Sequence, residues 1–87
     1  MTYAWKERED LARADRDIAA GEKRIADQIL VIQGLITSGR DTTEAETRLH
    51  TYRQTLQGQR RLRDLILDEI ARLEAPRSQR APTGSSS

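Results

Sequence analysis

The sequence predicts an all-α protein, in which two long helices fold back on each other as an antiparallel, coiled-coil-like hairpin. Two stretches repeat apolar residues every seven positions, which is a helical period. A short segment containing Ser38-Gly39 separates them and is too short for anything but an antiparallel connection. We expect helices at about residues 3–38 and 42–75, one domain over 1–75, and a disordered Pro-, Ser- and Gly-rich tail over 76–87.

Composition narrows the class of protein further. The 87 residues are 36% hydrophobic, 33% charged and 3% aromatic, and 15 basic side chains against 14 acidic ones give a net charge of +1. No global field therefore steers a polyanion or a membrane surface to the chain. There is no cysteine for a disulfide or a zinc ribbon, no apolar run long enough for a membrane span, and no signal-peptide pattern. We expect a cytoplasmic protein with no membrane association.

The first helix follows from one unbroken heptad position, occupied by Ala4, Leu11, Ile18, Ile25 and Ile32. A second position, three residues later, holds Ala14, Gly21, Gln28 and Leu35. Thr2 is the expected N-cap, and Gly39 is expected to take the left-handed conformation that ends the helix.

The second helix opens with two overlapping capping-box spacings, Asp41 with Glu44 and Thr43 with Glu46, between which the sequence does not choose. Its seam alternates by four and three residues through Ala45, Leu49, Tyr52, Leu56, Gln59, Arg63, Ile66, Ile70 and Leu73. Pro76 stops the helix because it removes a donor and clashes with the preceding turn.

The hairpin register follows from the turn. A fold-back at Gly39-Arg40 pairs residues whose numbers sum to about 80. This register places Gln28 near Tyr52, Arg63 near Asp15 and Asp17, and Gly21 opposite Gly58 and Gln59. A waist of glycines either permits close approach of the helices or forms a bendable point.

Exposed ion pairs are expected at Glu9–Arg13, Glu44–Arg48 and Asp68–Arg72.

Apolar side chains also occur where one hairpin seam does not use them. These side chains are Ile29, Leu30, Val31 and Ile36 on the first helix, and Leu62, Leu65 and Leu67 on the second, where they lie beside or behind the seam residue Ile66 and extend its apolar surface. A helix that is apolar on several sides is normally covered on several sides. A second copy, giving a homodimeric four-helix bundle, is the simplest cover, and another helical protein is the alternative.

Tyr3 and Trp5, at the open end, form either a small apolar plug or an anchor for a partner.

Catalytic and metal-binding chemistry has little support. His50 is the only histidine, and Glu46 lies one turn before it, but position 47 is Thr47, which breaks the spacing of a di-iron site. Asp64, Asp68 and Glu69 lie among arginines and are typical of a solvated charged face. We therefore expect no enzymatic activity, no catalytic residue, no cofactor, no metal and no small-molecule substrate.

Nucleic-acid binding is the second functional hypothesis. Arg60, Arg61 and Arg63 follow one another closely on the second helix, and Arg77 and Arg80 of the tail would add to them. Nearby carboxylates blunt this patch, and no aromatic residues are interleaved for base stacking. The first hypothesis is a non-enzymatic interaction or scaffold module that acts through its apolar helix faces.

Two runs carry a family resemblance. The run Leu11–Gln28 (LARADRDIAAGEKRIADQ), followed by Ser38–Glu46 (SGRDTTEAE), resembles a group of short, uncharacterised helical proteins of alphaproteobacteria. The resemblance covers roughly residues 10–72. It implies a bacterial, cytoplasmic protein with no assigned activity and supplies no catalytic residues.

Overall fold

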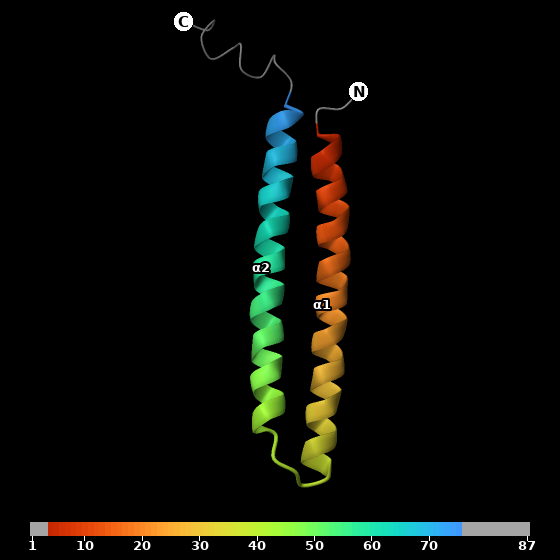
Figure 1. The fold of residues 1–87 in the computed structure, drawn as a ribbon, viewed down its shortest axis with the longest axis vertical. Coiled ribbons are helices and arrows are strands. Elements are labelled where there is room, and N and C mark those ends of the chain that lie inside the picture. Colours follow the sequence, from red (N-terminus) through yellow and green to blue (C-terminus); the bar gives the residue numbers. More distant parts are fainter. Residues whose placement is uncertain (1–3, 76–87) are drawn as a thin grey trace, which may run out of the picture.

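The computed structural model describes residues 4–75, which form two helices, α1 (Trp5–Thr37) and α2 (Thr43–Leu73). The helices run antiparallel and side by side over their length, so that the start of α1 lies beside the end of α2 (Figure 1). The predicted all-α hairpin is confirmed. Each helix is slightly shorter than expected at the open end. The predicted tail over 76–87, and Thr2 as a cap, lie outside the described residues.

The turn between the helices is built as the sequence predicts. Gly39 has a φ of 70°, in the left-handed region that costs glycine least. Its N–H donates to the carbonyl of Ile36 (3.0 Å), and the N–H of Arg40 donates to the carbonyl of Leu35 (2.8 Å). These two bonds satisfy carbonyls that the end of α1 leaves free, as in a Schellman motif.

The start of α2 differs from both capping boxes. The Asp41 carboxylate accepts hydrogen bonds from the Thr43 hydroxyl (2.8 Å) and the Thr43 N–H (3.1 Å). These bonds lower the pKa of Asp41, the side-chain bond more than the backbone bond. The Glu46 carboxylate accepts a hydrogen bond from the Thr42 hydroxyl (2.5 Å), and Glu44 forms an ion pair with Arg48. Both predicted boxes were wrong, because Asp41 bonds to Thr43 and not to the helix beyond it, and Glu46 bonds to Thr42 and not to Thr43.

The seam between the helices has the predicted membership. Ala14, Gly21 and Gln28 are the buried residues of α1, and Leu56 and Ile70 those of α2. Cross-helix contacts such as Glu22 with Arg60 and Gly21 with Gln59 join residues whose numbers sum to about 80. The predicted register is therefore confirmed.

The structure defines the bonding of one seam residue and corrects the position of another. Gln28 donates to the carbonyl of Ala45 (2.9 Å), while Tyr52, its expected neighbour, lies under the guanidinium of Arg24 (5.6 Å to the ring centroid). Gly58 does not face α1, because a Cβ placed on it meets no atom within 4 Å. The close approach at mid-length comes from Gly21 alone.

Ion pairs along single helices are only partly as expected. Glu44–Arg48 forms (3.6 Å). Arg13, however, pairs with Asp10 (3.8 Å) and not with Glu9, and Arg72 pairs with Glu69 and not with Asp68. Both corrected pairs are three residues apart, a spacing that also brings side chains together on a helix.

Candidate interaction surface

The hairpin has two broad faces, one on each side of its seam. The heptad positions that flank the seam in α1 and α2 define them. We call one the bridged face; it contains Arg8, Asp15 and Glu22 of α1 with Arg60, Leu67 and Glu74 of α2. We call the other the unbridged face; it contains Asp10, Arg13, Asp17, Ala20, Arg24, Asp27 and Val31 of α1 with Glu44, Arg48, Thr51, Thr55, Gly58, Leu62, Leu65, Glu69 and Arg72 of α2. A shallow hollow lies on each face.

Ion pairs connect the two helices on the bridged face. Arg60 pairs with Glu22 (3.0 Å), and Arg8 pairs with Glu74 through two hydrogen bonds at the open end. These bonds lower the pKa of Glu74 and raise that of Arg8. These two bridges satisfy the four charges that they join within one hairpin.

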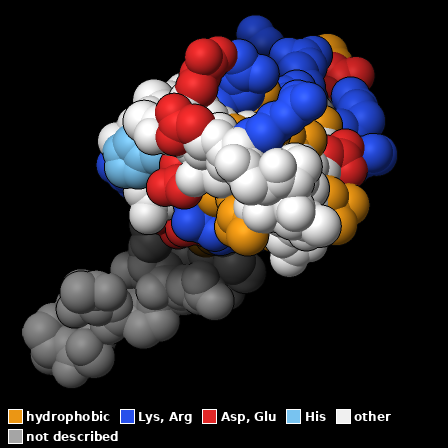
Figure 2. All heavy atoms as spheres, turned by 90° about the horizontal axis from the view of Figure 1, so that it is seen from below, with side chains coloured by type: hydrophobic (Ala, Val, Ile, Leu, Met, Phe, Trp, Pro, Cys, Tyr) orange, Lys and Arg blue, Asp and Glu red, His pale blue; other side chains and the backbone are white. Residues whose placement is uncertain are grey.

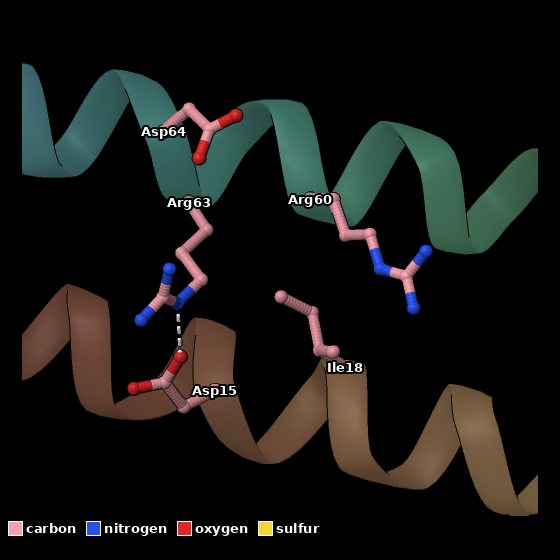
Figure 3. A pocket seen from close by; sticks show the side chains of 5 residues that line it. All are labelled: Asp15, Ile18, Arg60, Arg63 and Asp64. Carbon is pink, nitrogen blue, oxygen red and sulfur yellow. Dashed lines mark hydrogen bonds and ion pairs between the residues drawn. The ribbon is translucent and has the colours of Figure 1, made fainter.

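The hollow of the bridged face contains a further bridge, shown in Figure 3. Arg63 extends from α2 across the hollow, and its Nε donates to Asp15 of α1 at 2.5 Å. Ile18 lies between this pair and Arg60 (Figure 3). The predicted association of Arg63 with Asp15 is confirmed, whereas Asp17, the other expected neighbour, lines the hollow of the opposite face beside Leu62.

The bridged face also bears on the nucleic-acid hypothesis. Of the arginines in the basic run, Arg60 and Arg63 are held by carboxylates of α1, which offset the field that a phosphate would meet. Arg61 is exposed on the outside of α2. Arg77 and Arg80 lie outside the described residues. The hypothesis therefore gains no support from the arrangement of the described arginines.

The unbridged face is organised differently. Its ion pairs run within single helices: Asp10–Arg13, Glu44–Arg48, Glu69–Arg72, and Asp27 with Lys23. None of the ion pairs between residues 4–75 crosses from α1 to α2 on this face. Asp17 and Arg24 have no ion-pair partner among these residues, although Arg24 covers Tyr52.

Large apolar side chains lie on the outside of the hairpin. The most exposed aliphatic ones are Leu30 (65%), Leu65 (65%), Ile36 (63%), Leu62 (54%), Val31 (50%) and Leu67 (36%). Ile29 and Ile66 are half-buried against the seam. Viewed along the hairpin, hydrophobic side chains reach the surface between charged ones (Figure 2). Val31, Leu62 and Leu65 lie on the unbridged face.

The aromatic end residues do not both reach the seam. Trp5 is 60% exposed, so it does not lie buried between the helices. Tyr3, its expected companion, lies outside the described residues. At this end the helices are held by the pair Arg8–Glu74.

The candidate metal and acid–base residues are dispersed. His50 is exposed, and Glu46 is engaged by Thr42. Within residues 4–75, no three His, Asp or Glu side chains come together as a metal site would need. Asp64 lines the bridged-face hollow beside Arg60 and Arg63, while Glu69 pairs with Arg72 on the opposite face.

The difference between the two faces is the feature that sequence reasoning missed. The charges of each flank recur at seven-residue intervals in the sequence. Aligning the flanks of the two helices in the predicted register would have revealed that opposite charges face each other on one side of the seam and not on the other.

The fold places the chain among two-helix antiparallel hairpins. Comparison with known proteins adds no closer relation: no protein-family model, no curated protein sequence and no solved structure matches it. The resemblance to alphaproteobacterial helical proteins therefore stays a prediction. Across residues 4–75, neither helix combines the length and the apolar character needed to cross a membrane.

Proposed function

We propose that the chain is a non-enzymatic interaction module, which associates with another helical surface through its exposed apolar side chains. The observation that carries the proposal is the set of six large aliphatic side chains with a third to two thirds of their surface in water. Single exposed leucines are ordinary, but Leu62 and Leu65 are one turn apart and extend the apolar surface of the half-buried Ile66.

Physical reasoning supports association over catalysis. Burying apolar surface contributes about 25 cal/mol per Å², so covering these side chains favours a complex. The described titratable groups pair with one another along the helix surfaces and do not converge in an enclosed site. In line with its resemblance to short alphaproteobacterial proteins, we place the module in the bacterial cytoplasm.

A paired substitution tests this proposal. Replacing Leu30 and Leu65 with glutamate puts charges where apolar contacts are required, and it leaves the seam intact because both side chains are 65% exposed. The wild-type chain and the double variant are compared by light scattering for molar mass and as baits in affinity capture from the native cell. We expect the wild type to bind itself or a helical protein and the variant to lose that binding. Identical behaviour of the two would overturn the proposal.

A further inference from the structure

We propose that the occupant of the unbridged face is a second copy of this chain. The two copies are related by a two-fold axis that runs between them, perpendicular to the helices, at the level of Ala20 and Gly58. This inference rests on the proposed function and names its partner. The resulting assembly is an antiparallel four-helix bundle, in which α1 lies on α1 of the second copy and α2 lies on α2. The order of charges and small residues along this face supports this assembly.

The unbridged face leaves charges without a partner across the seam. Asp10 of α1 and Glu69 of α2 occupy facing flank positions across the seam, so like charges meet where the bridged face has ion pairs. Each is offset only by an arginine of its own helix. Asp17 has Leu62 as its cross-helix neighbour in the hollow of this face. The charges are therefore not arranged to pair within one hairpin.

The same charges pair with those of a rotated copy. A two-fold axis at the level of Ala20 brings together residues of α1 whose numbers sum to about 40, and residues of α2 whose numbers sum to about 116. Every charged residue that meets a charged residue then meets the opposite sign. The pairs, each formed twice, are Asp17–Arg24, Arg13–Asp27, Glu44–Arg72 and Arg48–Glu69.

The two helices support the same axis independently. The charges of α1 place it near Ala20, and those of α2 place it near Gly58. In the hairpin register these two levels coincide, because Gly21 contacts Gln59, the neighbour of Gly58. One axis therefore satisfies both helices, as a symmetric dimer requires.

Small residues lie where the copies come closest. Ala20 and Gly58 are at the axis, and the space around Gly58 is open to 4 Å. Small side chains at a helix crossing let two backbones approach. On α2, this register sets Leu62 against Thr55 of the second copy and Leu65 against Thr51, covering two of the most exposed apolar side chains.

Other arrangements of two copies are electrostatically worse. Moving the axis by half a heptad toward the open end places Asp17 against its own copy, and moving it toward the turn does the same to Arg24. A parallel dimer places Asp10 over Glu69 and forms none of the four pairs. On the bridged face, the charges beside the seam that form ion pairs are already engaged within the hairpin, and they are Arg8, Asp15, Glu22, Arg60, Arg63 and Glu74.

Charge reversal at Asp17 and Arg24 tests the inference, because neither has an ion-pair partner within residues 4–75. In Asp17→Arg or Arg24→Glu alone, both copies of this pair become repulsive. We expect the dimer Kd of each single variant to rise by about 10- to 100-fold. Mixing the two single variants restores opposite charges only between unlike chains. We therefore expect a heterodimer near wild-type affinity from a mixture whose components are each more monomeric.

Matched controls carry the same charge changes on the other side of the hairpin. Arg53 lies one heptad before Arg60, and Asp64 lines the bridged-face hollow, so both exposed residues are on the bridged side of α2. Asp64→Arg and Arg53→Glu are expected to leave the dimer Kd within about twofold of wild type. Arg24→Glu also removes the contact with Tyr52. Far-UV circular dichroism on each variant tests whether the hairpin persists. The Arg24→Glu chain lacks the Tyr52 contact both alone and in the mixture, so recovery on mixing does not depend on that contact.

Sedimentation equilibrium at several concentrations gives the result. Weakened single variants that recover on mixing support the inference, and recovery should fade as salt screens the pairs. A wild type that is monomeric at all concentrations overturns it, as do single variants that dimerise like the wild type or a mixture with no heterodimer. The proposed function fails separately, when Leu30→Glu with Leu65→Glu changes neither self-association nor capture of another protein.

Discussion

The close contact at Gly21 predicts that two glycine-to-alanine substitutions in α1 have different effects. Alanine is favoured over glycine in a helix interior by about 1 kcal/mol. At Gly34 a Cβ meets nothing within 4 Å, so Gly34→Ala should gain about 0.5–1 kcal/mol of unfolding free energy. For a domain of this size that corresponds to a Tm higher by about 2–8 °C.

At Gly21 the same gain is opposed by packing. A Cβ there lies 3.0 Å from Oε1 of Gln59 and 3.4 Å from Cδ1 of Leu56. The Gln59 oxygen is buried without a hydrogen-bond partner, so its side chain must shift within the seam. Overpacking of this kind costs about 1–3 kcal/mol. We expect Gly21→Ala to be neutral or to destabilise by up to about 2 kcal/mol.

Urea unfolding followed by far-UV circular dichroism measures both variants, at several protein concentrations so that association is separated from folding. In a Gln59→Ala background the obstacle is gone, and Gly21→Ala should recover most of its helical gain. A Gly21→Ala variant as stabilised as Gly34→Ala, with Gln59 present, would refute the reasoning.

Two further predictions concern the cross-helix ion pairs. The pKa of Glu74 is lowered from its ordinary value of 4.5 mainly by its hydrogen bonds from Arg8. The ionised carboxylate therefore stabilises the hairpin fully at pH values above 4.5, and this stabilisation is lost as the pH falls through the lower pKa of the folded state. The Tm difference between wild type and Glu74→Gln should therefore shrink on acidification; a difference independent of pH would contradict it. Arg63→Leu replaces a partly exposed ion pair, worth about 0.5–1 kcal/mol, with apolar burial worth about 1.5 kcal/mol, and should stabilise by up to about 1 kcal/mol in urea unfolding. A loss above about 1 kcal/mol would count against it.

The sequence by itself determined the fold class and the pairing of the helices. A seven-residue apolar repeat fixes which stripe of each helix faces the other, and Gly39 fixes where the chain turns. Together they set the register, because a short turn leaves little freedom in how the helices align. That register placed Arg63 near Asp15 and Asp17, and the structure pairs it with Asp15.

Local bonding was decided by the tertiary structure. Asp41, Gln28 and Arg13 each had several polar partners within reach, and the choice depends on side-chain rotamers and backbone positions of a few tenths of an ångström. Spacing along the chain does not distinguish a partner three residues away from one four residues away, since both lie on the same helix surface.

The two faces of the hairpin show the same division on a larger scale. Every charge on them is in the sequence, but whether it is satisfied depends on which flank of α2 lies beside which flank of α1. Assembling both helices made one face a set of cross-helix ion pairs and, among residues 4–75, left the other without a bridge between its helices. Electrostatic complementarity belongs to surfaces built from distant segments, and so it is fixed only once those segments are side by side.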